Sequence, residues 1–275
     1  MKLKHFAITA SLALLGMRGI LGTPAWAGGD TVAPGAKIRF STEDFSPPDG
    51  KTGEPLVVTI QAPSGAARIV SWDMTVFDPG DMPFISFKGV GPRAEVAWDG
   101  RGVKGDLVES ASQYTFVARI RDALGNVGET RATLTTGIVL LKGSSRYRIG
   151  ISSIVFKPDT ADFRDVEPAQ VARNLETLRL LAAKLKLFPG YRIRIEGHAV
   201  LTNWQDKAKA EAEQRNSLIP LSKARSEAIK AALVKYSIPA SAMETAGLGA
   251  KDPIVPDSDV KNRWKNRRVE IYLEG

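Results

Sequence analysis

The sequence contains no cysteine, and its 275 residues include only two histidines, His5 and His198. The absence of cysteine excludes a disulfide scaffold, thiolate zinc sites and a cysteine nucleophile. Two histidines are too few for a histidine-clustered zinc site. A Gly-rich phosphate loop and a nucleophile elbow are also missing. We therefore predict a protein that is not an enzyme, with no catalytic residue, no bound metal and no cofactor.

The N-terminal residues have the features of an export signal. Two lysines within the first four residues precede the apolar stretch 6–17, and small residues at 25–27 offer a cleavage site. The alternative is a membrane anchor, but the apolar stretch is too short to span a bilayer comfortably and Arg18 interrupts it. We predict a signal peptide over 1–27, an extension over 28–36, and a mature chain in the periplasm with no membrane span.

The formal charge of +8 is unevenly distributed along the chain. Residues 1–27 carry three basic side chains and no acidic one, residues 28–149 carry 14 of each sign, and residues 150–275 carry 21 basic and 16 acidic. The positive excess of the exported part therefore lies in the C-terminal region. The basic segment 261–268 contains one tryptophan and resembles a nucleic-acid patch, but export argues against nucleic acid, and we predict no such partner.

Residues 37–140 consist of short β-type runs separated by turn residues. The clearest runs are residues 56–60, 70–77, 114–120 and 131–134. About a hundred residues in roughly seven strands, with no amphipathic helix, are the size of an immunoglobulin-like (Ig-like) all-β sandwich. We interpret Asp49, Asp78 and Asp81 as turn residues and not as a calcium site, because the loops lack a dense run of carboxylates. Residues 141–149 are expected to form a linker.

Residues 150–275 alternate between strand and helix patterns, which predicts a second, α+β domain. A strand is expected at 154–156. A helix is expected to begin near Pro168, since proline suits the first helical turn, and apolar side chains then recur at steps of four and three over 171–185. From Tyr191 to Glu196 apolar and charged side chains alternate, as in a strand with one buried face.

Arg225 is the most informative side chain of the next helix. At 100° per residue, Leu221, Ala228 and Ile229 lie on both sides of it, so the guanidinium points out of the middle of an apolar arc. A lone buried charge is too costly, so Arg225 must be paired or bound to an anion. Two readings stay open at this point. One is an internal ion pair, with Asp159, Asp162 or Glu196 as partner, and the other is a site where the planar fork binds a carboxylate.

Two family resemblances bear on these regions. The first rests on the segments Phe45-Ser46-Pro47-Pro48-Asp49-Gly50, Ser71-Trp72, Ala97-Trp98-Asp99-Gly100-Arg101 and Arg121-Asp122-Ala123-Leu124-Gly125-Asn126. They resemble the bacterial Ig-like module of the flagellar-hook-cap (FlgD) type and cover most of residues 38–137. The resemblance implies a spacer or a docking unit for an unidentified envelope protein.

The second resemblance rests on six blocks that occur in order: Ile154-Val155-Phe156, Arg194-Ile195-Glu196-Gly197-His198, Leu221-Ser222-Lys223-Ala224-Arg225-Ser226, Gly247-Leu248-Gly249, Pro253-Ile254 and Asn266-Arg267-Arg268-Val269-Glu270-Ile271. They look like the OmpA-like peptidoglycan-binding domain and cover 150–275. The resemblance implies a βαβαβ-type fold that binds the cell-wall stem peptide, with Arg225 on a carboxylate of diaminopimelate. The implied binding residues are Arg225, His198, Ser222, Asp159, Asn266, Arg267 and Arg268. The pairing of the two modules also suggests a spirochaetal envelope protein.

The sequence departs from the family pattern at one important position. The family continues Gly-His-Thr-Asp, and its aspartate pairs with the ammonium group of diaminopimelate, whereas here Val200 follows Ala199. A valine side chain cannot accept hydrogen bonds from an ammonium group. Leu218 likewise replaces the family's asparagine. The main hypothesis is a periplasmic anchor, associated with the peptidoglycan or the outer membrane, that binds peptidoglycan non-covalently. The alternative is an envelope protein–protein adaptor that has lost diaminopimelate binding.

Overall fold

The computed structural model describes residues 35–43, 45–47 and 54–275. The signal peptide expected over 1–27 and most of the expected extension lie outside the described residues, as does Asp49. No helix in the described part of the chain is long and apolar enough to cross a membrane.

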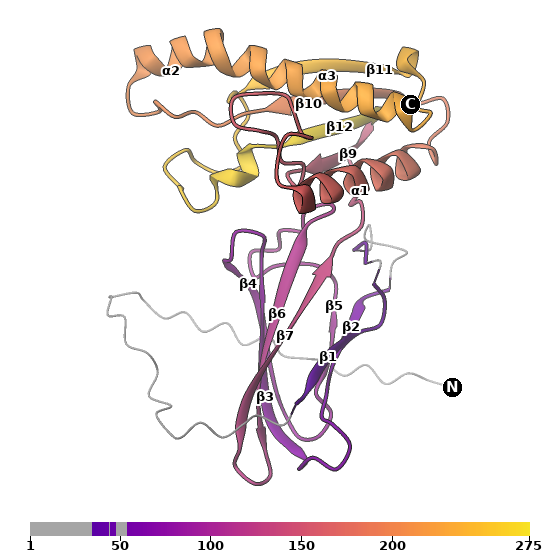
Figure 1. The fold of residues 1–275 in the computed structure, drawn as a ribbon, viewed down its shortest axis with the longest axis vertical. Coiled ribbons are helices and arrows are strands. Elements are labelled where there is room, and N and C mark those ends of the chain that lie inside the picture. The colour runs from indigo at the N-terminus through magenta and orange to yellow at the C-terminus, as the bar shows by residue number, and fades with distance from the viewer. Residues whose placement is uncertain (1–34, 44, 48–53) are drawn as a thin grey trace. The chain divides into compact units, whose positions relative to one another are not determined.

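The first part of the described chain is all β and forms two antiparallel sheets (Figure 1). The strands are β1 (Lys37–Phe40), β2 (Leu56–Gln61), β3 (Ile69–Phe77), β4 (Pro83–Val90), β5 (Glu95–Trp98), β6 (Gln113–Asp122) and β7 (Val127–Thr135). Strands β1-β2-β5 form a three-stranded sheet and β4-β3-β6-β7 a four-stranded one. Alternate residues of most of these strands are buried, as expected when one face of each sheet is covered.

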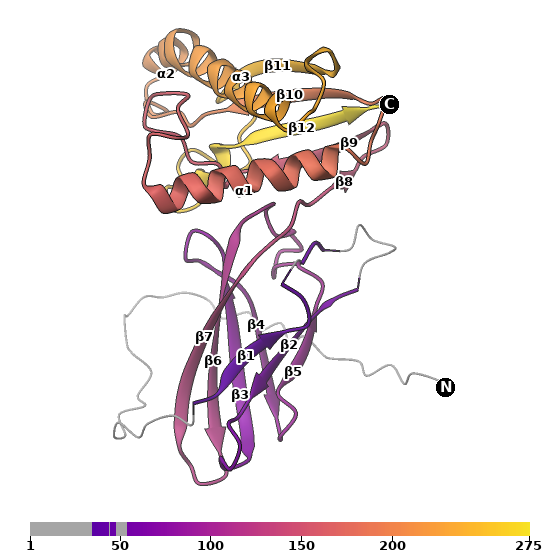
Figure 2. The same cartoon turned by 45° about the vertical axis from the view of Figure 1, so that its right-hand side comes forward.

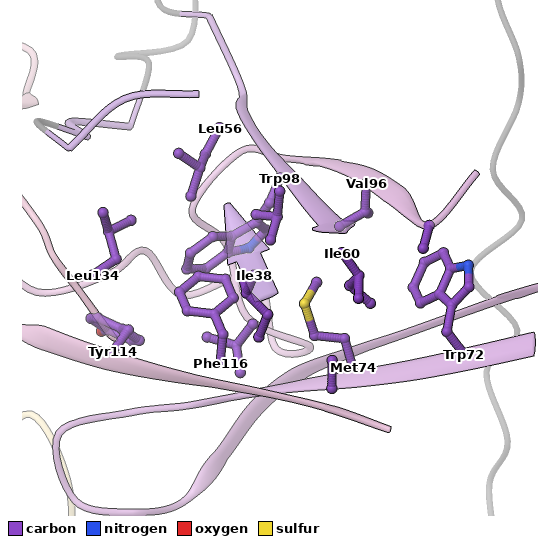
Figure 3. Packing of buried hydrophobic residues seen from close by; sticks show 14 of the residues in the cluster. Ile38, Leu56, Ile60, Trp72, Met74, Val96, Trp98, Tyr114, Phe116 and Leu134 are labelled. Carbon is purple, nitrogen blue, oxygen red and sulfur yellow. The ribbon is translucent and has the colours of Figure 1, made fainter. Parts of the chain in front are cut away.

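Side chains from both sheets fill one hydrophobic core, shown in Figure 3. Trp98 lies at its centre, 1% exposed, and its ring meets those of Phe116 and Tyr114 edge to face. At another part of the core, the ring of Trp72 lies against Gly89, where an added Cβ would stand 2.6 Å from the indole. Glycine at position 89 is therefore what allows the indole to pack onto strand β4.

The second part of the chain is a five-stranded sheet in the order β11-β10-β12-β9-β8, with two long helices on one face (Figures 1 and 2). Its elements are β8 (Leu141–Lys142), β9 (Arg146–Ile151), α1 (Pro168–Leu185), β10 (Arg192–His198), α2 (Lys207–Glu213), α3 (Ile219–Lys235), β11 (Met243–Gly249) and β12 (Val269–Glu274). Strands β10 and β11 are parallel, and the other pairs are antiparallel. This is the α+β arrangement that the sequence predicted for the C-terminal domain.

The segment expected as a linker takes part in this sheet. Residues 141–149 form β8 and the first part of β9, and β9 pairs with β12 along its whole length. Conversely, residues 154–156, expected as a strand, pair with no strand in the described part of the chain. The amide of buried Asn174 on α1 takes the place of a partner strand: its Oδ1 accepts from Val155 N (3.0 Å), and its Nδ2 donates to Val155 O (2.8 Å). One side chain thus makes the backbone hydrogen bonds that a neighbouring strand would otherwise make.

Helix α1 begins at Pro168 as predicted, and it buries Leu178, Ala182 and Leu185 of the predicted stripe together with Leu181. Helix α3 packs on β10 and β11 through two glycines. A Cβ on Gly197 would lie 2.0 Å from the backbone oxygen of Ser222, and one on Gly247 would lie 2.4 Å from the nitrogen of Lys223. Only residues without a side chain permit this close approach of helix to sheet.

Helices α2 and α3 are joined through a π-helical turn, Gln214–Leu218, into one long helix. Pro220 lacks an N–H group, and the wider π turn accommodates a residue that cannot continue the regular α-helical hydrogen bonds. The side chain of Gln214 in this turn donates to Leu248 O (2.8 Å) and accepts from Ala250 N (2.8 Å). The turn is thus tied to the end of β11.

Candidate functional site

Arg225 lies on α3 at the edge of the face that the helix buries. The buried residues of α3 are Ser222, Ser226, Ile229, Ala232 and Leu233. At 100° per residue their centre lies roughly 50° from Arg225, so the expectation that Arg225 occupies the middle of the buried arc was wrong. The reason is the close contact at Gly197 and Gly247, which turns the serine side of the helix toward the sheet. Arg225 itself is partly buried.

The Arg225 side chain is held by the segment that follows residues 154–156. Its Nε donates to the backbone oxygen of Thr160 at 2.9 Å, and its guanidinium carbon lies 4.9 Å from the centroid of the Phe156 ring. In the described part of the chain, neither Nη group has a hydrogen-bond partner, and Arg225 forms no ion pair. The internal ion pair left open by the sequence is therefore not formed, and both Nη groups are available to an anion.

Two charged side chains lie within electrostatic reach of Arg225. Burial lowers the pKa of Arg225, the positive charge of Arg267 lowers it further, and the negative charge of Asp159 raises it. The pKa of Arg267 is likewise lowered, by burial and by Arg263. Since arginine stays protonated in proteins, both guanidinium groups keep their positive charge, and burial is the main cause of both pKa shifts. Phe156, Arg225 and Arg267 line the same open pocket.

Two of the other predicted site residues are buried supports. Ser222 is fully buried, and its Oγ donates to Ile219 O (3.1 Å) and accepts from Gly249 N (2.9 Å). Asn266 is 1% exposed, accepts from the backbone nitrogens of Ile254 and Val255, and donates to Val255 O. Both side chains are hydrogen-bonded to backbone atoms of the protein, so they position the loops around the site.

His198 and Arg268 belong to a buried charge network on the sheet face opposite to the helices. Glu270 accepts from Arg148 and Arg268 at 2.9 Å each and from Tyr272 at 2.5 Å. Glu196, which faces Glu270 across the β10–β12 pair, accepts from Arg194 at 2.6 Å. Three arginines thus surround two carboxylates.

Glu196, His198 and Glu270 place ligand atoms within 4.8 Å of one another and form the one group of metal-ligand type found in the described residues. The arginines of the network occupy the carboxylate oxygens and leave the cluster with an excess of positive charge. A divalent cation would have to displace these arginines, so the donor set does not favour a metal.

Burial is the main reason that the pKa of His198 falls from 6.5 to about 4, and Arg268 lowers it further against the opposing effect of Glu270. His198 is therefore neutral at pH 7, and its 3.7 Å approach to Glu270 is not an ion pair under those conditions. Because the folded pKa is below the unfolded one, the folded state is favoured fully above pH 6.5. This contribution is lost as the pH falls from 6.5 toward 4.

Val200 follows the end of β10 and is partly buried, and Leu218, at the other position that departs from the family pattern, is buried. Between them, Glu213 accepts from the backbone nitrogens of Thr202 (3.0 Å) and Asn203 (2.8 Å). This carboxylate orders the long connection that precedes α2. No residue of α2 is buried, so this connection adds an exposed helical extension to α3.

Two contacts of the site were not foreseen from the sequence. Thr160 contacts Arg225 through its backbone oxygen, an atom that every residue type has, so the residue type could not indicate this contact. Phe156 was assigned to a strand, and its ring instead contacts the guanidinium of Arg225. An aromatic residue close to a charge-rich turn was the only available signal.

With this geometry established, comparison with known proteins defines the class of the C-terminal domain. Residues 155–267 match the model of the OmpA family. The domain is thus OmpA-like and has the α+β fold described above.

Individual proteins match the same region. The probable lipoprotein YiaD of Escherichia coli (strain K12) is 28% identical over 131 residues, which are 48% of this chain and 55% of YiaD. The peptidoglycan-binding protein ArfA of Mycobacterium tuberculosis is 33% identical over 103 residues, which are 38% of this chain and 28% of ArfA. The chain therefore matches about half of YiaD and less than a third of ArfA.

Among solved structures, the periplasmic domain of Helicobacter pylori MotB is 18% identical with a TM-score of 0.40, over 49% of this chain and 77% of that one. The cell wall anchor of the T6SS from Pseudomonas aeruginosa is 19% identical with a TM-score of 0.39, over 50% of this chain and 87% of that one.

Proposed function

We propose that this protein is a non-catalytic, periplasmic envelope protein that binds peptidoglycan through its OmpA-like domain. The observation that carries the proposal is Arg225, held by Thr160 O with both Nη groups unoccupied by the described residues. A carboxylate of the wall stem peptide would accept two hydrogen bonds from this fork, and Arg267 would add positive charge beside it. The match to the OmpA family and the similarity to the peptidoglycan-binding protein ArfA support the choice of ligand.

The N-terminal sandwich would act as an Ig-like spacer or as a docking unit for another envelope protein. Its seven strands in two antiparallel sheets support this assignment, and so does the resemblance to the hook-cap module. An export signal at residues 1–27 and a spirochaetal origin remain predictions from the sequence.

Sedimentation with isolated sacculi tests peptidoglycan binding. Wild type is expected in the pellet, and Arg225→Ala in the supernatant. Arg192→Ala is the matched control, because Arg192 is exposed at the start of β10, away from the site, and this variant should sediment like wild type. Circular dichroism verifies that each variant is folded. If folded Arg225→Ala sediments as well as wild type, Arg225 does not carry the binding.

Two observations favour a second candidate, an envelope adaptor without wall binding. Val200 stands where the family has an aspartate, and α2 exposes a helical extension with no buried residue. An adaptor would retain its protein partner in a pull-down after complete digestion of the wall by muramidase. An anchor would lose every component that is held through the wall.

A further inference from the structure

Three loops of the sandwich form one continuous surface at the same end of its two sheets. They connect β2 to β3 (residues 62–68), β4 to β5 (residues 91–94) and β6 to β7 (residues 123–126). The first loop borders both others, since it lines one depression together with residues 92–95 and a second one together with Leu124. Ala123 N also donates to Arg68 O at 2.8 Å, which ties the first loop to the third. We call this surface the loop end of the sandwich.

Two exposed arginines of the loop end have no partner among the described residues. Arg68 and Arg93 line the same depression, and neither side chain forms an ion pair or a hydrogen bond with another described residue. Glu95 is the one carboxylate that lines this depression within the described chain. The nearby carboxylate of Asp122 is buried in its own turn, where it accepts hydrogen bonds from residues 124–126. The loop end therefore offers unpaired guanidinium groups to an anion.

Apolar side chains are exposed at the same end. Leu124, in the β6–β7 turn, is 79% exposed, and Val90, the last residue of β4, is 85% exposed. Two exposed prolines, Pro63 and Pro92, add apolar surface to the other two loops. Single exposed apolar side chains are ordinary on a protein surface. Several of them on adjacent loops, next to unpaired arginines, indicate a surface that binds a partner.

The N-terminal part of the chain joins the sandwich at this end as well. Lys37, the first residue of β1, pairs with Gln61, the last residue of β2, directly before the loop 62–68. Residues 1–34, which contain the apolar stretch 6–17, therefore lead into the fold at the loop end. This holds whether the stretch is removed as a signal or kept as a membrane anchor.

We propose that the loop end of the sandwich docks on an anionic phospholipid surface. Arg68 and Arg93 bind lipid phosphate groups, because the planar fork of a guanidinium suits a phosphate. Leu124 and Val90 enter the boundary between headgroups and acyl chains. Basic side chains and buried apolar area both strengthen binding to such a surface. The inference concerns the sandwich alone, so it does not depend on wall binding by Arg225.

Co-sedimentation with lipid vesicles tests the inference. One set of vesicles consists of phosphatidylcholine, which is neutral, and the other of an equal mixture of phosphatidylcholine and anionic phosphatidylglycerol. The wild-type protein is used as the full chain and in a form that begins at Gly28. The second form keeps every described residue and lacks the apolar stretch 6–17, which could insert into the vesicles by itself.

Two variants and two matched controls separate the contributions of charge and apolar surface. Arg68→Ala/Arg93→Ala removes the two unpaired arginines, and Lys104→Ala/Arg131→Ala removes the same charge from exposed positions outside the loop end. Leu124→Ser removes the exposed leucine. Its control is Val103→Ser, since Val103 is 73% exposed in the loop between β5 and β6, at the other end of the strands. Circular dichroism verifies that each variant is folded.

Wild type should bind the anionic vesicles, should bind the neutral ones weakly, and should be released by added salt. Arg68→Ala/Arg93→Ala should bind the anionic vesicles about thirtyfold more weakly, because each basic side chain near an anionic surface contributes about fivefold. Leu124→Ser should weaken binding about tenfold, the effect of no longer removing a leucine from water. Both controls should bind like wild type, and all variants should sediment with sacculi like wild type.

Three results would overturn the inference, and none of them bears on peptidoglycan binding, which the sacculi measure separately. If wild type binds neutral and anionic vesicles equally, the arginines do not recognise lipid phosphate. If Arg68→Ala/Arg93→Ala binds the anionic vesicles as tightly as wild type, another surface makes the contact. If wild type binds neither kind of vesicle, the lipid assignment is wrong and the loop end is left to a protein partner.

Discussion

Replacing Gly197 by alanine tests how helix α3, and with it Arg225, is positioned. A Cβ at this residue would lie 2.0 Å from the backbone oxygen of Ser222 and 2.8 Å from its carbonyl carbon. Both atoms belong to the helix backbone, so no side-chain rotation relieves the clash. The helix must move away from β10 by about 1 Å, and overpacking of this kind costs about 3 kcal/mol. For a domain of this size, that loss corresponds to a fall in Tm of roughly 10 °C.

Thermal and urea unfolding followed by circular dichroism measure the effect. Gly150→Ala is the matched control, because Gly150 lies in β9 of the same sheet and an added Cβ there would meet no atom within 4 Å. The control should change the free energy of unfolding by less than about 0.5 kcal/mol. Gly197→Ala should also weaken wall binding, since the shifted helix carries Arg225. If Gly197→Ala is as stable as Gly150→Ala, the packing of α3 on β10 is not what the structure shows.

Three further predictions concern the supports of the fold and the site. Asn174→Ala should lower the stability of the C-terminal domain by about 3 kcal/mol in urea unfolding, because it leaves the backbone of Val155 unpaired; an effect below 1 kcal/mol would contradict this role. As the pH falls from 6.5 to 4, the free energy of unfolding should fall by about 3 kcal/mol, because the unfolded state binds a proton on His198 that the folded state does not bind. His198→Gln should remove that part of the pH dependence. An unchanged pH profile of this variant would show that other groups cause it. Gly89→Ala should push on the Trp72 ring and destabilise the sandwich by about 2 kcal/mol while leaving sacculus binding unchanged; a parallel loss of binding would implicate the sandwich in wall contact.

The regular elements of the C-terminal domain could be predicted because their patterns are local. The apolar stripe that includes Leu178 and Leu185 predicted α1, and alternation over Tyr191 to Glu196 predicted β10. The error at residues 154–156 has a non-local cause, because a single amide on Asn174 satisfies a backbone that looks like a strand. No pattern within three residues contains that information.

The candidate site was predicted only in part, because its geometry also depends on contacts between residues that are distant in the sequence. The sequence drew attention to Arg225 and Asp159, but it centred the buried face of α3 on Arg225. Gly197 and Gly247 determine the actual face, and their effect depends on which strands the helix crosses. The hydrogen bond from Arg225 to Thr160 O joins residues 65 positions apart through a backbone atom, which residue types do not encode.

The central claim is that Arg225 binds a wall carboxylate, and binding to chemically modified sacculi tests it most directly. Sacculi whose carboxylates have been converted to amides keep their glycan and peptide bonds but offer no anion to the guanidinium. The affinity of the wild-type chain for native sacculi should fall at least tenfold on amidation, and Arg225→Lys, which keeps the charge but not the planar fork, should lie between wild type and Arg225→Ala. Equal binding of the wild-type chain to native and amidated sacculi would contradict the claim.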